Sequence, residues 1–110
     1  MIEEIVLNYL KENLEIPAYM EEPEKPPKEY VLVEKIGSSE SDMVCTATMV
    51  VQSYSDSLYH TAMLNDKIKE IMKNITSLYD VSHCTCNSDY NYTDTTTKRY
   101  RYQAVFDIVY

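Results

Sequence analysis

The stretch from Ser57 to Ile75 constrains the fold more than any other part of the chain, because it has the pattern of a single amphipathic helix. Neither Gly nor Pro interrupts it, and Ser57, or Asp56 before it, can accept hydrogen bonds from the first free backbone N–H groups. Side chains expected to face the core recur at spacings of three and four: Leu58, Thr61, Leu64, Ile68, Ile71, Met72 and Ile75. The stretch therefore predicts a helix with one buried stripe.

Stretches of alternating polar and apolar residues lie on both sides of this predicted helix. Met43 to Tyr54 precedes it, and Val81 to Tyr92 and Lys98 to Tyr110 follow it. Such alternation is typical of strands with one buried face. Tyr30 to Ile36 is rich in Val, Leu and Ile and predicts a further strand. A polar turn at Gly37 to Asp42 would join that strand to the next one as a hairpin.

The first part of the chain predicts a second helix and a short strand. Residues 2 to 14 place Ile and Leu side chains on one face, and Pro17 ends the pattern. We expect an edge strand at Ala18 to Met20 and an exposed connection at Glu21 to Lys28, which holds three prolines. The order of elements predicts a single α+β domain over residues 1–110. Its antiparallel sheet would have about four to five strands, with two helices packed on one face.

The pairing of the last two predicted strands depends on the length of the loop between them. If the loop has an odd number of residues centred on Thr95, Cys84 faces Phe106, Cys86 faces Ala104 and Tyr90 faces Tyr100. The other face then pairs opposite charges and polar groups, which stabilises a hairpin. A two-residue turn would place the Cys and Phe side chains on opposite faces. We therefore expect the odd loop.

A formal net charge of −8 and the absence of a basic run argue against sequence-specific binding of DNA or RNA, which requires clustered Lys and Arg. No apolar run approaches the roughly 20 residues that cross a membrane, so no membrane partner is expected. Glu3 and Glu4 near the start argue against a signal peptide. We expect a cytoplasmic product whose three cysteines are reduced thiols.

No residue pattern predicts a catalytic or metal site. His83, Cys84 and Cys86 form the one cluster of metal-ligating residue types, but in a strand His83 would face away from the two thiols. Only Cys45 and His60 remain to complete a tetrahedral set. The single glycine excludes most phosphate-binding and nucleophile motifs. We predict no enzyme activity, no metal and no cofactor. The alternative is a small ligand-binding domain or enzyme with a pocket between helix and sheet.

Tyrosine is the unusual feature of the composition, with eleven Tyr against one Phe and no Trp. Tyr is favoured in protein–protein interfaces because its ring is stiff and amphipathic. The alternative is that the rings line the rim of a small core with their hydroxyl groups in solvent. We predict a contact surface at one end of the last hairpin, together with acidic residues of the proline-rich connection. Its expected members are Tyr90, Tyr92, Arg99, Tyr100, Arg101, Tyr102, Glu21, Glu22 and Glu24.

Several local stretches carry a resemblance to a known family, in an order that spans essentially the whole chain. They are Ile16-Pro17-Ala18-Tyr19 after the opening helix, Tyr30-Val31-Leu32-Val33-Glu34-Lys35 after the Glu-Pro-rich stretch, Gln52-Ser53-Tyr54, Ala62 on the central helix, and Tyr100-Arg101-Tyr102-Gln103-Ala104-Val105-Phe106. In these stretches the chain is similar to the small tail-terminator or tail-completion proteins of tailed bacteriophages.

The resemblance implies an α+β fold, no catalysis, and assembly into a six-membered ring that caps the head-proximal end of the tail tube. It implies three partners: further copies of the chain in a hexameric ring, the tail tube protein, and a neck or head-completion protein. The expected location is the virion or a phage-tail-like particle, reached from the cytoplasm of the bacterial host during assembly. The alternative within the same class is a head–tail connector in the neck.

Overall fold

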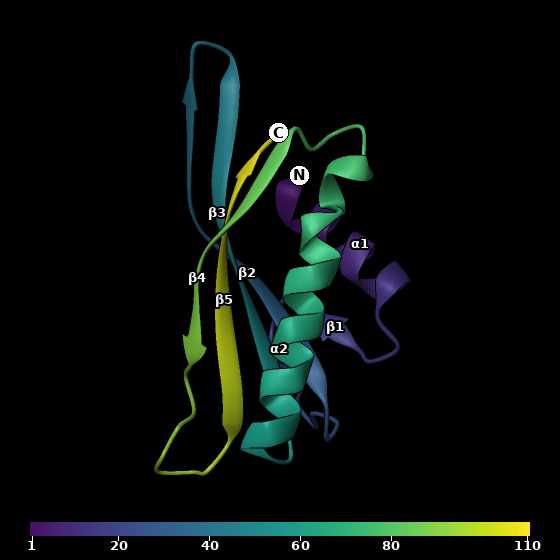
Figure 1. The fold of residues 1–110 in the computed structure, drawn as a ribbon, viewed down its shortest axis with the longest axis vertical. Helices are drawn as coiled ribbons and strands as arrows, with labels where there is room; N and C mark the ends of the chain where they lie inside the picture. The colour runs from purple at the N-terminus through teal and green to yellow at the C-terminus, as the bar shows by residue number, and fades with distance from the viewer.

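The computed structural model describes residues 1–110 and confirms the α+β class. Five strands form one sheet in the spatial order β1-β2-β3-β5-β4, and both helices lie on the same face of it (Figure 1). Neither helix combines the length and the apolar character that crossing a membrane requires. The elements are α1 (Ile2–Asn13), β1 (Ala18–Tyr19), β2 (Tyr30–Ser41), β3 (Val44–Ser55), α2 (Leu58–Lys73), the 3₁₀ turn η1 (Ile75–Ser77), β4 (His83–Asn91) and β5 (Tyr100–Val109).

The sheet is mixed rather than purely antiparallel. β1 runs parallel to β2, with Ala18 opposite Val31 and Tyr19 opposite Leu32. The proline-rich connection at residues 20–29 returns the chain to the end where β1 began, and such a return forces the two strands to run in the same direction. The prediction of an edge strand at this position is confirmed, and the prediction of an antiparallel sheet is wrong for this pair.

Helix α2 has the predicted start and supplies the predicted buried stripe. The Ser57 hydroxyl oxygen accepts a hydrogen bond of 3.1 Å from the backbone N–H of His60, which confirms the N-cap. The helix ends at Lys73, because Asn74 takes the C-cap position and the chain continues as η1. Leu58, predicted to be in the stripe, is 41 % exposed.

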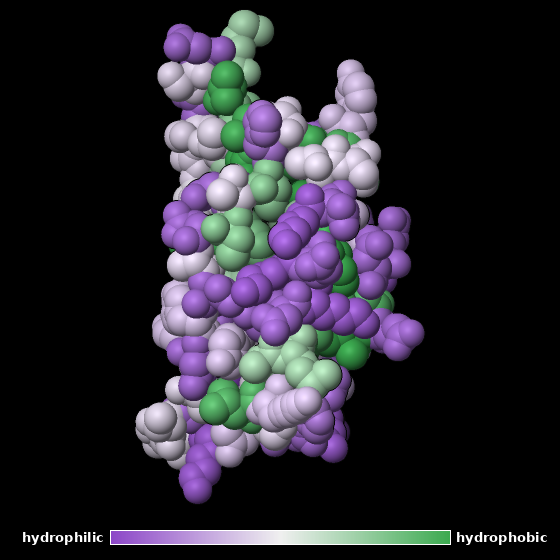
Figure 2. Space-filling model, viewed as in Figure 1, coloured by the Kyte–Doolittle hydropathy of each residue, from purple (hydrophilic) through white to green (hydrophobic).

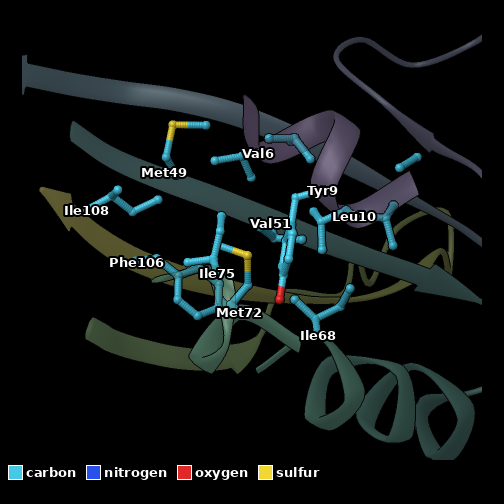
Figure 3. Packing of buried hydrophobic residues seen from close by; sticks show 14 of the residues in the cluster. Val6, Tyr9, Leu10, Met49, Val51, Ile68, Met72, Ile75, Phe106 and Ile108 are labelled. Carbon is cyan, nitrogen blue, oxygen red and sulfur yellow. The ribbon is translucent and has the colours of Figure 1, made fainter. Parts of the chain in front are cut away.

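The core lies between this stripe, α1 and the covered face of the sheet. Figure 3 shows Met72 and Ile75 packed against Phe106, with Val6 and Leu10 of α1 closing the other side. All five side chains are at most 1 % exposed. The Tyr9 hydroxyl donates a hydrogen bond of 2.8 Å to the backbone oxygen of Ile71, so α1 is tied directly to α2.

The β2–β3 hairpin is longer than predicted and turns at a different place. The polar residues from Gly37 to Ser41 continue β2 instead of forming the turn, after a bulge at Ile36. The turn consists of Asp42 and Met43 alone, with φ angles of 51° and 68°. Two residues with positive φ are typical of the hairpin turn whose twist matches that of the strands. The prediction failed because Asp42, although common in such turns, is followed by Met43 at the position where they usually contain Gly.

Replacing Met43 with glycine is therefore expected to stabilise the fold. Glycine adopts positive φ without the steric penalty that a side chain meets, so the free energy of unfolding should rise by roughly 0.5–1 kcal/mol. Urea unfolding followed by circular dichroism measures this change. Met43→Ala is the control, since it removes the long side chain but retains the penalty at the same φ. An equal effect of the two substitutions would contradict the explanation.

The β4–β5 hairpin differs from the predicted register. Its loop is even, since Asp94 and Arg99 form a bridge around the four residues 95–98. A bulge at Asn87 then shifts the pairing by one residue, so Cys86 faces Phe106 while Tyr90 faces Gln103. The bulge keeps the Cys side chains on the same face as Phe106, as predicted, despite the even loop. Its second consequence is that Tyr90 and Tyr100 lie on opposite faces of the sheet.

Candidate functional site

The face of the sheet that the helices leave uncovered carries a continuous group of aromatic and arginine side chains. Alternation along the strands places them there, because Val31 next to Tyr30 and Ser53 next to Tyr54 are buried under the helices. We name this group the tyrosine–arginine row. It consists of Tyr19, Tyr30, Tyr54, Tyr90, Tyr92, Arg99 and Arg101.

The ring of Tyr30 stacks on the ring of Tyr54 at the centre of the row. Their centroids are 4.5 Å apart and the planes differ by 3°. The two residues are directly paired across β2 and β3, which fixes this contact. Tyr19 meets Tyr30 edge-on at 6.2 Å, and β1 positions it there. Each such pair contributes about 0.5–1.5 kcal/mol beyond the area it buries.

The two arginines join the parts of the row. The Arg99 guanidinium lies 5.0 Å from the centroid of Tyr54, and that of Arg101 lies 4.5 Å from the centroid of Tyr92. Arg101 also donates to the Tyr92 backbone oxygen at 2.6 Å and to the Tyr54 hydroxyl oxygen at 3.1 Å. Tyr92 in turn meets Tyr90 edge-on at 5.9 Å. The rings are therefore held in place before any partner arrives.

Exposure separates the row into a buried centre and an open end. Tyr30 and Tyr54 are 2 % and 5 % exposed, whereas Tyr90 and Tyr92 are 42 % and 45 % exposed. The centre stabilises the uncovered face, and the open end presents two oriented rings to solvent. Tyr and Arg are the side chains that most often carry the binding energy of protein–protein interfaces. The open end of the row therefore has the composition and rigidity of a contact surface.

One acidic residue of the proline-rich connection reaches the row. Glu22 forms an ion pair with Arg99 and accepts a hydrogen bond of 2.6 Å from the Tyr30 hydroxyl. It thereby ties the connection to the uncovered face. Glu21 and Glu24 are exposed and form no ion pair or hydrogen bond. Of the three acidic residues predicted to join the contact surface, the structure brings only Glu22 to the row.

The predicted contact surface is divided between the two faces of the sheet. Tyr90, Tyr92, Arg99 and Arg101 belong to the row, as described above. Tyr100 and Tyr102 alternate with Arg101 along β5, so they lie half-buried on the helix side. The prediction that the four tyrosines gather on one surface is wrong, because the bulge at Asn87 was not foreseen. Tyr19, Tyr30 and Tyr54 were missed because they lie far from the last hairpin in the sequence.

A second feature is a pocket of about 550 Å³ between α2 and β4. Its lining is mixed: Met72, Phe106, Cys84 and Cys86 are apolar, and Asp66, Lys69, Glu70 and Lys73 are charged. Burial, and then the charges of Cys86 and Asp107, raise the pKa of the Cys84 thiol to about 11. The pKa of Cys86 is raised by burial and by Asp89. Both groups are therefore neutral thiols at pH 7, and the pocket offers apolar contact rather than a nucleophile.

The raised pKa predicts slow alkylation of Cys84. Since the thiolate is the reactive form, its rate with iodoacetamide should still rise about tenfold per pH unit between pH 8 and pH 10. The exposed thiol of Cys86 should be modified first at pH 8, because reagent reaches it more easily. Mass spectrometry of the peptides measures both rates, with the urea-unfolded chain as control. A rate for Cys84 that levels off near pH 9 in the folded protein would contradict the assignment.

One cluster has the residue types of a metal site. The ligand atoms of Glu29, Asp56 and His60 lie within 4.8 Å of one another at the start of α2. The Lys28 ammonium, 2.9 Å from Asp56, already provides a cation there. Lys28, followed by His60, holds the pKa of Asp56 well below its usual range. Asp56 is thus accounted for as the centre of an exposed ion-pair group.

His83, predicted to face away from Cys84 and Cys86, lies opposite Val109 on the uncovered side of β5.

Comparison with known proteins assigns no family to the chain, since no protein-family model matches it and no curated protein matches it. The features that bear on function are the surfaces described above and the sequence resemblance. The most distinctive of these surfaces is the tyrosine–arginine row.

Proposed function

We propose that the chain is a structural assembly subunit whose copies form a ring at the head-proximal end of a tail tube, in a tailed phage or a phage-tail-like particle. The ring stops growth of the tube and forms the joint to the neck. The proposal includes a six-membered ring and contacts with the tail tube protein and a neck or head-completion protein. It also includes assembly in the cytoplasm of a bacterial host. The sequence resemblance supports the placement, and the uncovered face of the sheet supports assembly.

The observation that carries the assembly part is the open end of the row. A sheet that keeps one face free of helices, and fixes rigid tyrosine rings on that face, offers a surface that loses little conformational entropy on binding. Arg101 holds Tyr92 against its guanidinium at 4.5 Å, so the ring does not have to be ordered at the moment of contact. This pre-organisation lowers the conformational entropy that is lost when a protein partner binds.

The free edges of the sheet supply further contacts. β4 is one edge, and β1 covers only Val31 and Leu32 of β2 at the other, so the rest of β2 has unpaired backbone groups. β2 and β4 run in opposite directions, because each neighbouring pair from β2 through β3 and β5 to β4 is antiparallel. The edge of one copy could thus pair in antiparallel fashion with the opposite edge of another. Contacts between two different surfaces of successive copies build a closed ring when the rotation from one copy to the next adds up to a full turn.

Native mass measurement tests this proposal. Size-exclusion chromatography with light scattering of the full chain, alone and mixed with the tail tube protein, should give a multiple of the 12.8 kDa chain mass, with six as the expected number. The mixture is included because some ring subunits close only on their partner. A chain that stays monomeric in both samples and binds a small molecule in the α2–β4 pocket would overturn the proposal in favour of a ligand-binding domain.

A further inference from the structure

We propose that the open end of the tyrosine–arginine row binds the carboxylates of Glu40 and Asp42, at the tip of the β2–β3 hairpin, from a second copy of this chain. The Tyr90 hydroxyl donates a hydrogen bond to this acidic tip, and Arg101 supplies a cation. The inference deepens the proposed function and rests on it in one respect, that the partner is another copy. It names the chemistry of the contact, which the proposed function leaves open.

A chain of hydrogen bonds along the uncovered face fixes the direction in which the Tyr90 hydroxyl donates. Arg101 donates to the Tyr54 hydroxyl oxygen at 3.1 Å, and Tyr54 donates to the Gln52 side-chain oxygen at 3.0 Å. The Gln52 amide donates to Gln103 at 2.7 Å, and the Gln103 amide donates to the Tyr90 oxygen at 2.5 Å. A guanidinium has only donors, and Tyr54 is 5 % exposed, so the Tyr54 hydroxyl has to donate onward within the protein. Tyr90 therefore receives the last hydrogen bond, and its own O–H has no acceptor in the same copy.

The donors at the open end suit an acceptor with negative charge. Tyr90 is 42 % exposed, so its free O–H is accessible to a partner. Arg101 forms no ion pair, and its bonds to Tyr92 and Tyr54 use only two of its N–H groups. The Tyr92 ring joins the two donors, since it contacts the Arg101 guanidinium at 4.5 Å and the Tyr90 ring at 5.9 Å. A carboxylate is the side-chain group that accepts from hydroxyl and guanidinium donors without offering a donor of its own.

The centre of the row already binds one carboxylate with the same two kinds of donor. Glu22 forms an ion pair with Arg99 and accepts a hydrogen bond of 2.6 Å from the Tyr30 hydroxyl. At the open end, Arg101 and Tyr90 are the corresponding guanidinium and hydroxyl. Neither of them forms an ion pair with a carboxylate of its own copy or donates a hydrogen bond to one. The row thus shows within one chain the type of contact that we infer between two.

The open end carries positive charge in a chain whose formal net charge is −8. Residues 90–101, which form this end, hold three cations and one carboxylate: Lys98, Arg99, Arg101 and Asp94. Glu22 neutralises one of the cations, and the adjoining pair of Lys28 with Asp56 adds no net charge. The carboxylate in the loop accepts hydrogen bonds from two backbone N–H groups of the same loop. An excess of positive charge at this end favours a negatively charged partner.

The tip of the β2–β3 hairpin, residues 38–45, has the opposite charge. It carries Glu40 and Asp42 and no cation; both side chains are exposed, and neither forms an ion pair or a hydrogen bond. Met43 beside them is 95 % exposed, and a thioether makes favourable contacts with aromatic rings such as the exposed ring of Tyr92. Figure 2 shows hydrophilic and apolar atoms next to each other at the top of the molecule, which is the hairpin tip in Figure 1. The tip therefore offers two carboxylates and a methionine to the cations and rings of the open end.

The contact has to form between copies. The molecule is 44 Å long, and Figure 1 shows the hairpin tip at one end of the long axis and the β4–β5 loop at the other. The tip stands beyond the ends of β4 and β5, so its own sheet does not block the approach of another copy. A donor end and an acceptor end on one chain generate head-to-tail contacts, as a ring requires.

Tyr90→Phe tests the hydroxyl donor. The substitution removes the O–H and keeps the ring, so the dissociation constant of self-association should rise about tenfold, as for the loss of a hydrogen bond to a charged acceptor. Tyr92→Phe is the matched control, because the Tyr92 hydroxyl has no part in the chain of hydrogen bonds and should change the constant by less than about threefold. Analytical ultracentrifugation measures both values. Equal effects of the two substitutions would show that the Tyr90 hydroxyl does not bind the partner.

Exchanging the charges of the two ends tests the contact itself. The tip variant carries Glu40→Lys with Asp42→Lys, and the end variant carries Lys98→Glu with Arg101→Glu. Each variant alone should associate at least about tenfold more weakly than wild type, because its tip and its open end then have charges of the same sign. An equimolar mixture of the two should regain the wild-type dissociation constant within about threefold, since each tip again meets an end of opposite charge. A mere disturbance of the row by Arg101→Glu would not be repaired by a second protein with an altered tip.

Glu4→Lys with Glu12→Lys is the matched control for the tip variant. Both residues are exposed on α1 and form no ion pair, and the change in net charge is the same. This variant should associate like wild type, because neither residue belongs to the tip or to the open end. If it weakens association as much as the tip variant does, the contact is wrong, since any change of net charge then has the same effect.

The remaining outcomes separate this inference from the proposed function. If wild type forms an oligomer and the mixture associates no better than the separate variants, the tip contact is wrong and the ring proposal stands. If wild type and the mixture both stay monomeric, with and without the tail tube protein, both proposals fail. Association that is lost in each variant and restored in the mixture supports the contact.

Discussion

Replacing Tyr92 with alanine is expected to weaken self-association about 30-fold or more, which corresponds to the loss of roughly 2 kcal/mol at an interface hot spot. Tyr92 is 45 % exposed, and Arg101 and Tyr90 fix its ring in one orientation. Removing it takes away one of the two oriented rings at the open end of the row. A dilution series in the analytical ultracentrifuge measures the change in dissociation constant.

The control for Tyr92→Ala is Tyr79→Ala. Tyr79 is fully exposed and has no place in the row, so its loss should leave self-association unchanged. Tyr92→Phe should retain most of the affinity, because the ring and its contact with Arg101 persist. The free energy of unfolding should change by less than about 1 kcal/mol in Tyr79→Ala and Tyr92→Phe, and should fall by about 1–2 kcal/mol in Tyr92→Ala, which loses the contacts with Tyr90 and Arg101. Equal association of Tyr92→Ala and Tyr79→Ala would show that the row is only a cover for the sheet.

Replacing Phe106 with alanine is expected to have the largest effect on the fold, a loss of about 3–5 kcal/mol in the free energy of unfolding. Phe106 is 1 % exposed and packs against Met72 of α2 and Ile75 of η1 (Figure 3). A domain of this size has about 5–15 kcal/mol in total, so much of its stability depends on this ring. Urea unfolding followed by far-ultraviolet circular dichroism measures the loss.

Val105→Ala is the matched control for this substitution. Val105 is the preceding residue of β5 and faces the uncovered side, where it is half-buried. Its truncation removes two methyl groups from a partly solvated place and should cost roughly 1 kcal/mol. Losses of equal size at Val105 and Phe106 would contradict a main core on the helix side of the sheet.

The sequence predicted the parts of the fold that follow from local periodicity. The stripe around Ile68, the cap at Ser57 and the alternation of β3 and β5 are each visible within a short window, and the structure confirms them. The register predicted for the β4–β5 hairpin was wrong because its loop is even and β4 has a bulge at Asn87. The turn of the β2–β3 hairpin was misplaced because the polar residues from Gly37 to Ser41 continue β2 past a bulge at Ile36. A bulge adds one residue without a compositional signal, so periodicity alone does not reveal it.

Only part of the contact surface was predicted, because the rest depends on strand pairing that periodicity does not reveal. Four members of the row come from the last hairpin, where Tyr and Arg stand close in the sequence. Tyr30 and Tyr54 become neighbours only through the pairing of β2 with β3, and the misplaced turn concealed that pairing. The stack also requires the bulge at Ile36, because with the turn at Asp42 and Met43 alone Tyr30 would face Ser55 instead of Tyr54. Its link to Arg99 depends in addition on the even loop of the β4–β5 hairpin.

The length of tail tubes in particles assembled without this chain tests the central claim most directly. Electron microscopy of such particles, beside particles complemented with the wild-type chain, measures it. A subunit that caps the tube predicts tubes that are overlong or ragged, with normal length restored on complementation. Tubes of normal length that merely lack heads would contradict the account and place the chain in the neck as a connector.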